Sequence, residues 1–144
     1  METEEALRRS PCNSDPVSSP QGEFRKVTRP KVLIVEDSFP LQRFYREVLN
    51  EKYTILQAYS VDHGEQLFRK HPDVAAIVMD ACVPGHKPTT PPLVRRIRKS
   101  YHGPIIAASS DDDFQDALIS AGCNHRAFKH TVPDKLAELL DPDR

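Results

Sequence analysis

The feature that most constrains the fold is a regular alternation of short apolar runs and amphipathic segments, which starts at Lys31. Successive runs begin 21, 21, 30 and 21 residues apart, a spacing that one strand, one helix and two turns fill. Three runs are continuously apolar, as strands buried on both faces of a parallel sheet are. The pattern predicts an α/β fold with helices on both faces of a parallel sheet. The runs begin near Val32, Tyr53, Val74, Pro104 and His125.

The segments between the runs have the spacing of amphipathic helices. In the first segment, apolar residues from Leu41 to Leu49 repeat at helical intervals behind Ser38, which can cap the helix. In the fourth, Gly122 is expected to end the helix. Five helices complete a (βα)5 arrangement, and they are expected at residues 38–49, 60–71, 93–101, 114–121 and 133–140.

Composition limits the number of domains and the kinds of partner. A chain of 144 residues with 38% hydrophobic residues is expected to form one domain, and a formal net charge of −1 gives no general attraction to nucleic acid. The longest apolar run, residues 74–79, is far shorter than the roughly 20 residues that span a bilayer. The N-terminus lacks the apolar stretch of a secretory signal, so we expect a cytoplasmic protein.

Residues 1–30 differ in composition from the rest of the chain. They are rich in Ser, Pro and charges of both signs, and they show almost no apolar periodicity. This composition predicts a disordered N-terminal tail or linker, followed by one folded domain at 31–144. The three cysteines, Cys12, Cys82 and Cys123, are widely spaced and are expected to be reduced thiols.

Polar residues follow four of the five predicted strands. Glu36 and Asp37 end the first and Asp80 ends the third. The carboxyl ends of parallel strands share one edge of the sheet, where ligands bind, so these carboxylates should meet. Three clustered carboxylates repel one another without a cation, and Mg²⁺ suits such an open, oxygen-rich site. Ser109 and Lys129 follow the fourth and fifth strands and could meet the oxygens of a phosphoryl group.

Four segments in this order resemble the receiver domain of two-component response regulators. The resemblance covers about residues 31–141, nearly all of the predicted domain. It implies a flavodoxin-like, doubly wound sandwich with a five-stranded parallel sheet of order 2-1-3-4-5. The segments that carry it are 32–38, 77–85, 104–110 and 122–129.

The resemblance also implies a signalling role for the residues at the strand ends. Asp80 would accept a phosphoryl group from the phosphohistidine of a histidine kinase or histidine phosphotransfer protein, and the chain would act as a switch more than as an enzyme. Lys129 would pair with the phosphoryl group, and the Ser109 hydroxyl would turn toward it. The implied Mg²⁺ ligands are Asp37, Asp80 and the backbone carbonyl of Cys82, with Glu36 acting through water.

The sequence departs from the usual receiver pattern at three places. His130 follows Lys129 where proline is common, so we expect a trans peptide bond there and a rerouted loop. Arg126 stands where receivers commonly place an aromatic residue, and it is expected on the surface or paired with acidic residues of 111–113. Phe128 is then expected in the core. The proline-rich segment 84–92 is expected to form an extended loop over Asp80.

Two alternatives to a phosphorylated receiver remain open. The first is a degenerate receiver that binds partners without being phosphorylated. The second is an enzyme or flavin carrier on a similar fold, although a phosphatase of the haloacid-dehalogenase type would need a second Asp where Cys82 stands. A soft-metal site at Cys82 and His86 is less favoured because no second pair accompanies them.

The remaining expectations concern output from the domain. About three residues follow the last predicted helix, so we expect no DNA-binding or catalytic output domain there. Output would pass through contacts of the fourth and fifth helices, and of the strand between them, with an unknown protein target. A dimer that forms on phosphorylation is a further expectation.

Overall fold

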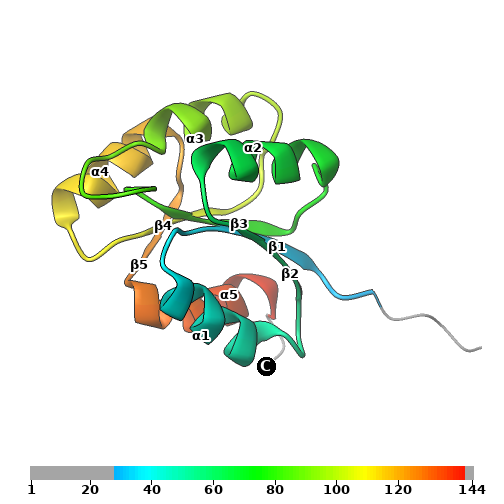
Figure 1. Cartoon of the computed structure of the whole chain (residues 1–144). Coiled ribbons are helices and arrows are strands. Elements are labelled where there is room, and N and C mark those ends of the chain that lie inside the picture. The colour runs from blue at the N-terminus through cyan, green and yellow to red at the C-terminus, as the bar shows by residue number, and fades with distance from the viewer. Residues whose placement is uncertain (1–27, 142–144) are drawn as a thin grey trace, which may run out of the picture.

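The computed structural model describes residues 28–141, and these residues form one five-stranded parallel sheet with five α-helices (Figure 1). The strand order is β2-β1-β3-β4-β5, as the resemblance implied. The strands are β1 (Lys31–Val35), β2 (Thr54–Ala58), β3 (Ala76–Asp80), β4 (Ile105–Ala108) and β5 (His125–Ala127). The helices are α1 (Phe39–Leu49), α2 (Val61–Lys70), α3 (Pro91–Arg98), α4 (Asp112–Ala121) and α5 (Val132–Leu140), with a short 3₁₀ helix, η1 (Lys129–Thr131).

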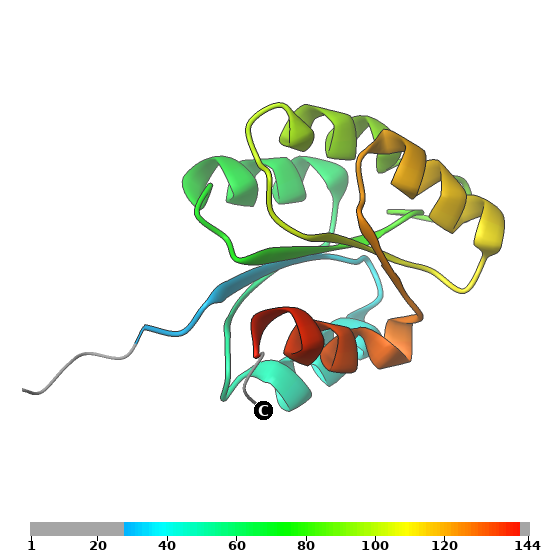
Figure 2. The same cartoon turned by 180° about the vertical axis from the view of Figure 1, so that it is seen from behind.

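The helices lie in two layers, one on each face of the sheet. Helices α1 and α5 cover one face, and α2, α3 and α4 cover the other, as the views from front and back show (Figures 1 and 2). Strand β1 contributes side chains to both layers because successive side chains point to opposite faces of the sheet. Val32 and Ile34 pack with Tyr45 of α1, whereas Leu33 and Val35 pack in the core below the other three helices. All five residues of β3 are buried, as expected for a central strand.

Side-chain caps begin three of the helices, including the one for which the sequence predicts Ser38 as the cap. The side chains of Ser38, Ser60 and Asp111 each accept a hydrogen bond from a backbone N–H in the first turn of α1, α2 and α4. Thr90, at the same position of α3, makes no such bond. Helix α4 ends at Gly122, which has a φ of 138°, a conformation that favours glycine.

The C-terminal part of the sheet corrects one prediction and confirms another. Phe128 is half exposed and lies outside the core, because β5 ends one residue earlier and Phe128 begins the turn into η1. Its ring stacks on that of His130 instead. Within residues 28–141 the only cis peptide bond is Val83–Pro84, so the bond between Lys129 and His130 is trans, as predicted.

The predicted loop at 84–92 is too long by two residues, because Pro91 and Pro92 form the first turn of α3, where proline is tolerated. Tyr101, expected at the end of the third helix, lies beyond α3 but is buried beside Phe68. The predicted tail at 1–30 lies almost wholly outside the described residues. No helix within 28–141 has the length and apolar character needed to cross a membrane.

Candidate functional site

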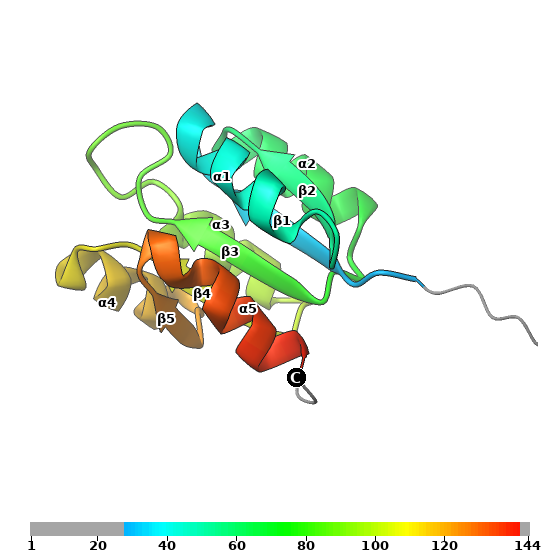
Figure 3. The same cartoon turned by 90° about the horizontal axis from the view of Figure 1, so that it is seen from below.

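The site lies at the carboxyl edge of the sheet, where the loops after β1, β3, β4 and β5 meet. A cleft of about 490 Å³ opens there. It includes all five side chains that the sequence singles out at the strand ends. The loop after β3 stands out beyond the same edge, beside the starts of α1 and α4 (Figure 3). The residues that line the cleft are Glu36, Asp37, Ser38, Asp80, Cys82, Gly85, His86, Ser109, Ser110, Asp111, Phe114 and Lys129.

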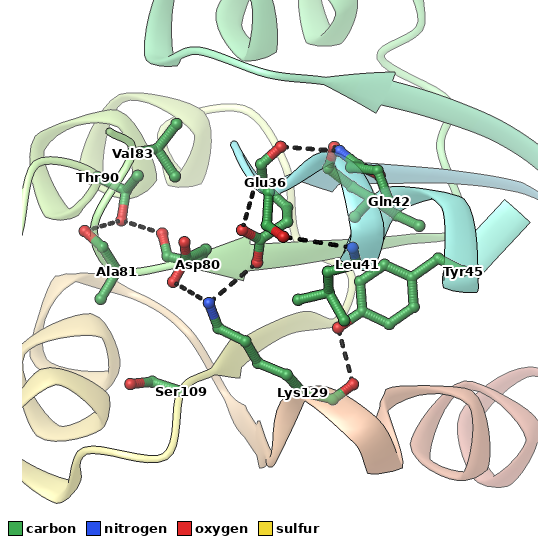
Figure 4. A network of polar contacts seen from close by, with 12 residues as sticks. Glu36, Leu41, Gln42, Tyr45, Asp80, Ala81, Val83, Thr90, Ser109 and Lys129 are labelled. Atoms are coloured by element: carbon green, nitrogen blue, oxygen red, sulfur yellow. Dashed lines mark hydrogen bonds and ion pairs between the residues drawn. The ribbon is translucent and has the colours of Figure 1, made fainter. Parts of the chain in front are cut away.

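The ammonium group of Lys129 joins two carboxylates at the bottom of this cleft (Figure 4). Its Nζ lies 3.1 Å from Oε1 of Glu36 and 3.2 Å from Oδ1 of Asp80. Glu36 and Asp80 are 2% and 5% exposed, so water contributes little to solvating either charge. One lysine from the end of β5 therefore holds together the ends of β3, the central strand, and of β1 beside it.

The pKa values of these groups show that one ammonium does not fully compensate the buried carboxylates. Burial, together with the charge of Asp80, raises the pKa of Glu36 to about 7. Burial also raises the pKa of Asp80, although Lys129 and a hydrogen bond from the backbone N–H of Cys82 oppose the shift. Burial lowers the pKa of Lys129, but the two carboxylates outweigh burial and the net shift is upward. The site favours an additional cation.

The donor atoms fit a hard divalent cation. Carboxylate oxygens of Glu36, Asp37 and Asp80 lie within 4.8 Å of one another. Oxygen ligands of this kind suit Mg²⁺, which binds through one or two carboxylates and retains several waters. Sulfur and imidazole are not part of this cluster, and burial raises the pKa of the Cys82 thiol, which disfavours the thiolate that a soft metal would need. The donor set favours the predicted Mg²⁺ site over the soft-metal alternative.

Ser109 is buried at the end of β4 and lines the cleft beside Lys129. Its Oγ accepts a hydrogen bond from the N–H of Asp111 at 3.1 Å. Its backbone carbonyl accepts one from the side chain of Gln115, which also donates to the carbonyl of Ala127. Gln115 thus ties the end of β4 to the end of β5 from helix α4.

Arg126 of β5 contacts one acidic residue and one amide of α4. Its Nη2 lies 2.8 Å from Oδ1 of Asp116, and its Nη1 donates to Oε1 of Gln115 at 3.3 Å. Arg126 is exposed, so the predicted surface position is confirmed, whereas the alternative of pairing within 111–113 is wrong. Asp116 lies one helical turn further along α4, directly across from β5.

Three buried polar residues that support the site escaped the sequence analysis. Gln42 of α1 is fully buried and donates to the carbonyl of Glu36, as well as to carbonyls of β1 and β2 (Figure 4). Thr90 and Gln115 hold the backbone at Asp80 and Ser109. The available signal is weak: each is a polar residue beside apolar positions at the start of a helix, a place where polar residues are ordinarily exposed or capping.

Solved structures of other proteins share this fold. No protein-family model matches the sequence, and no curated protein does. The receiver domain of Ssk1 from Saccharomyces cerevisiae, in complex with the histidine phosphotransfer protein Ypd1, is 21% identical, with a TM-score of 0.65 over 80% of this chain and 91% of that one. The chemotaxis protein CheY4 of Vibrio cholerae is 19% identical, with a TM-score of 0.66 over 78% and 100%.

A third similar structure is a two-component response regulator from Clostridium difficile. It is 17% identical, with a TM-score of 0.67 over 78% of this chain and 97% of that one. Residues 28–141 therefore have the fold of response regulator receiver domains, a five-stranded member of the flavodoxin-like class.

Proposed function

We propose that this chain is the phosphoacceptor receiver of a two-component phosphorelay and that Asp80 takes the phosphoryl group. The observation that carries the proposal is the pairing of Lys129 with both Asp80 and Glu36 in an open cleft. A carboxylate that serves only packing would be expected to have one cation as a fixed partner. Here two carboxylates share one cation, and both retain raised pKa values.

The reaction follows from the positions of these groups. A carboxylate oxygen of Asp80 would attack the phosphorus of a phosphohistidine, forming an acyl phosphate while the P–N bond breaks and the imidazole nitrogen keeps the electron pair. Phosphoryl transfer depends mainly on in-line positioning and on neutralising the oxygens. Lys129 would pair with a phosphoryl oxygen, and the hydroxyl of Ser109 would donate to another.

The same proposal includes Mg²⁺ as the cofactor. Asp37, Asp80 and the backbone carbonyl of Cys82 would hold the ion, and Glu36 would act through water. When bound, the ion supplies positive charge to the phosphoryl oxygens. Lys129 then has only part of the charge to compensate, which leaves its ammonium able to follow the phosphoryl group.

An exposed apolar face on α1 favours a protein as the phosphodonor. Phe39, Phe44 and Val48 are 73%, 37% and 48% exposed, and the same helix begins at Ser38, which lines the cleft. A groove of about 330 Å³ runs between Phe39 and Phe44. Large exposed apolar residues next to a reactive site are typical of docking surfaces. A histidine kinase or histidine phosphotransfer protein could rest on this face while its phosphohistidine enters the cleft.

The phosphorylated state would be recognised on the surface formed by α4, β5 and α5. Phosphorylation adds charge where Lys129 and Ser109 can respond, and both adjoin elements of the α4, β5 and α5 surface. Phe128 is exposed on this surface next to Lys129. We propose that a cytoplasmic protein target, or a second copy of the chain, reads the switch there, without direct contact to nucleic acid or membrane.

The test is phosphorylation of the full chain by a small donor. With Mg²⁺ and acetyl phosphate, intact mass should show one added phosphoryl group on the wild type and none on Asp80→Ala. Asp112→Asn, a change at an exposed acidic residue of α4, should behave as the wild type does. A wild-type chain that stays unmodified with acetyl phosphate and phosphohistidine proteins, and that binds no Mg²⁺, would instead support the phosphorylation-independent binding module.

A further inference from the structure

The backbone around Asp80 is held by two adjacent threonines at the far end of the proline-rich loop. The loop runs from the end of β3 to Thr89 and Thr90, and its residues 84–88 are all exposed. The backbone N–H groups of both threonines point at the carbonyl of Ala81, at 2.9 and 3.3 Å. The two ends of the loop are thus tied together directly behind Asp80.

Thr90 sits where a capping residue belongs but does not cap. It is the N-cap residue of α3, yet its side chain makes no bond to the first turn of that helix, unlike Ser38, Ser60 and Asp111 at the corresponding places. Its hydroxyl lies 2.7 Å from the backbone carbonyl oxygen of Asp80 and 3.1 Å from that of Ala81 (Figure 4). A hydroxyl has one hydrogen, so it donates to the nearer carbonyl, that of Asp80.

Burial makes this hydrogen bond hard to replace. Thr90 is fully buried, and Asp80 is 5% exposed, so water cannot take over either partner easily. Thr89 completes the arrangement: its Oγ1 accepts from the N–H of Val83 and donates to the carbonyl of Val83, each at 2.9 Å. The segment from Asp80 to Val83 is therefore held at both ends.

The part of that segment between the two anchors carries the chemistry of the site. The backbone N–H of Cys82 bonds to the carboxylate of Asp80 and lowers its pKa, against the larger effect of burial. The carbonyl of Cys82 belongs to the proposed Mg²⁺ ligands. A shift of this backbone would move the phosphoacceptor oxygen and a metal ligand together.

We propose that Thr90, with Thr89, is a positioning pair that fixes the backbone at Asp80 for phosphoryl transfer. The inference rests on the proposed function, and it assigns a role to residues of the proline-rich loop rather than to the strand ends. Since the transfer is sensitive to the placement of the attacking oxygen, loosening the backbone slows the reaction without removing any reacting group.

The decisive variants keep the shape of Thr90 and change only its hydrogen bonding. Thr90→Val keeps the branched side chain but lacks the hydroxyl, and Thr90→Ser keeps the hydroxyl. With Mg²⁺ and saturating acetyl phosphate, Thr90→Val should be phosphorylated about tenfold more slowly than the full-length wild type, and Thr90→Ser should recover to within about twofold. Amide hydrogen exchange at Ala81 and Cys82 should quicken in Thr90→Val alone.

Ser60→Ala serves as the matched control. It removes the hydrogen bond that the Ser60 hydroxyl accepts from the backbone N–H of His63 at the exposed N-cap of α2, and it should lower the melting temperature while leaving the phosphorylation rate unchanged. Equal slowing in Ser60→Ala would reduce the effect of Thr90→Val to general destabilisation and overturn the inference.

Further outcomes separate this inference from the proposed function. Phosphorylation of Thr90→Val at the wild-type rate overturns the positioning role alone. A wild type that takes no phosphoryl group overturns the proposed function and the positioning role with it. If Thr90→Val does not fold, Thr89→Val, at an exposed residue, carries the test: an unchanged rate and unchanged exchange at Cys82 overturn the inference.

Discussion

The hydroxyl of Tyr45 donates a hydrogen bond to the backbone carbonyl of Lys129 at 2.8 Å (Figure 4). This bond joins α1 to the first residue of η1. The ring of Tyr45 is 1% exposed, so its position is set by the core between α1 and α5. Lys129 is thus anchored by its backbone on one side and by two carboxylates on the other.

Removing the hydrogen bond between Tyr45 and Lys129 tests how much it contributes to the stability of the fold. Tyr45→Phe keeps the ring and leaves the carbonyl of Lys129 without its partner, so the free energy of unfolding should fall by about 1 kcal/mol. Urea denaturation with an unchanged m-value measures this. Tyr59→Phe, at a partly exposed residue, is the control; an equal loss there would contradict a specific role for the Tyr45 bond.

Metal-free protein should lose stability as the pH rises through the acid range. The pKa of Glu36 is about 7 in the fold against 4.5 when exposed, so the folded chain binds a proton more tightly than the unfolded chain does. The free energy of unfolding should therefore fall between about pH 4.5 and 7, by up to about 3 kcal/mol, and Asp80 shifts in the same direction. Urea titrations in EDTA should show this slope reduced in Glu36→Gln; parallel slopes would refute it.

Magnesium should stabilise the folded chain. Binding to the native state alone at about 100 times the Kd adds about 2.7 kcal/mol to the free energy of unfolding. Thermal unfolding with and without MgCl₂ measures the gain, which should vanish in Asp37→Asn and in Asp80→Asn. Asp113→Asn, on the exposed first turn of α4, should keep it. A full gain in Asp37→Asn would exclude this residue as a ligand.

Substitution of Gln42 should reduce the free energy of unfolding more than substitution at most other positions of α1. Its side-chain amide donates to the carbonyls of Ile34, Glu36 and Ala58 in a place closed to water. Gln42→Met fills similar space but takes the amide donor away from these carbonyls, of which that of Ala58 still accepts the backbone N–H of Glu36. We therefore expect a loss of about 2 to 4 kcal/mol in the free energy of unfolding, measured by chemical denaturation. Arg43→Ala, at the exposed neighbouring position, should change stability by less than about 0.5 kcal/mol. A loss in Gln42→Met no greater than that would contradict the role of the amide.

The apolar face of α1 should matter for a protein donor and not for a small one. Phe39→Ala should leave the rate with acetyl phosphate unchanged, because Phe39 is 73% exposed and does not line the cleft. It should slow transfer from a phosphohistidine protein that phosphorylates the wild type by about tenfold, the loss of one apolar anchor. Stopped-flow or mass-based time courses with both donors compare the two rates. Equal rates with the protein donor would place docking elsewhere.

Much of the fold follows from local pattern, and the exceptions have a common cause. Periodicity and capping predict the order of strands and helices because each depends on residues close in sequence. The prediction of Phe128 in the core is wrong because the burial of Phe128 depends on where β5 ends, and β5 is an edge strand that pairs with β4 alone among the five strands. The strand order itself came from the resemblance, since spacing alone does not determine it.

The sequence predicts some features of the site and not others. Strand ends in a parallel sheet share an edge, so Glu36, Asp80 and Lys129 could be brought together from the sequence. The pairing of Lys129 with Glu36 as well as Asp80, at closely similar distances, depends on side-chain directions that no spacing reveals. Gln42 and Thr90 donate hydrogen bonds to backbone carbonyls. Every residue has such a carbonyl, so no sequence pattern indicates which one is bound.

The parallel order of the sheet has a consequence for synthesis of the chain. Glu36 lies near the start of the described residues and Lys129 near their end, and the two meet only after β5 has paired with β4. A chain still emerging from the ribosome holds its acidic residues without the lysine that compensates them. Competence to take a phosphoryl group would therefore be acquired only after β5 and Lys129 have been synthesised, so chains truncated before Lys129 should not be phosphorylated.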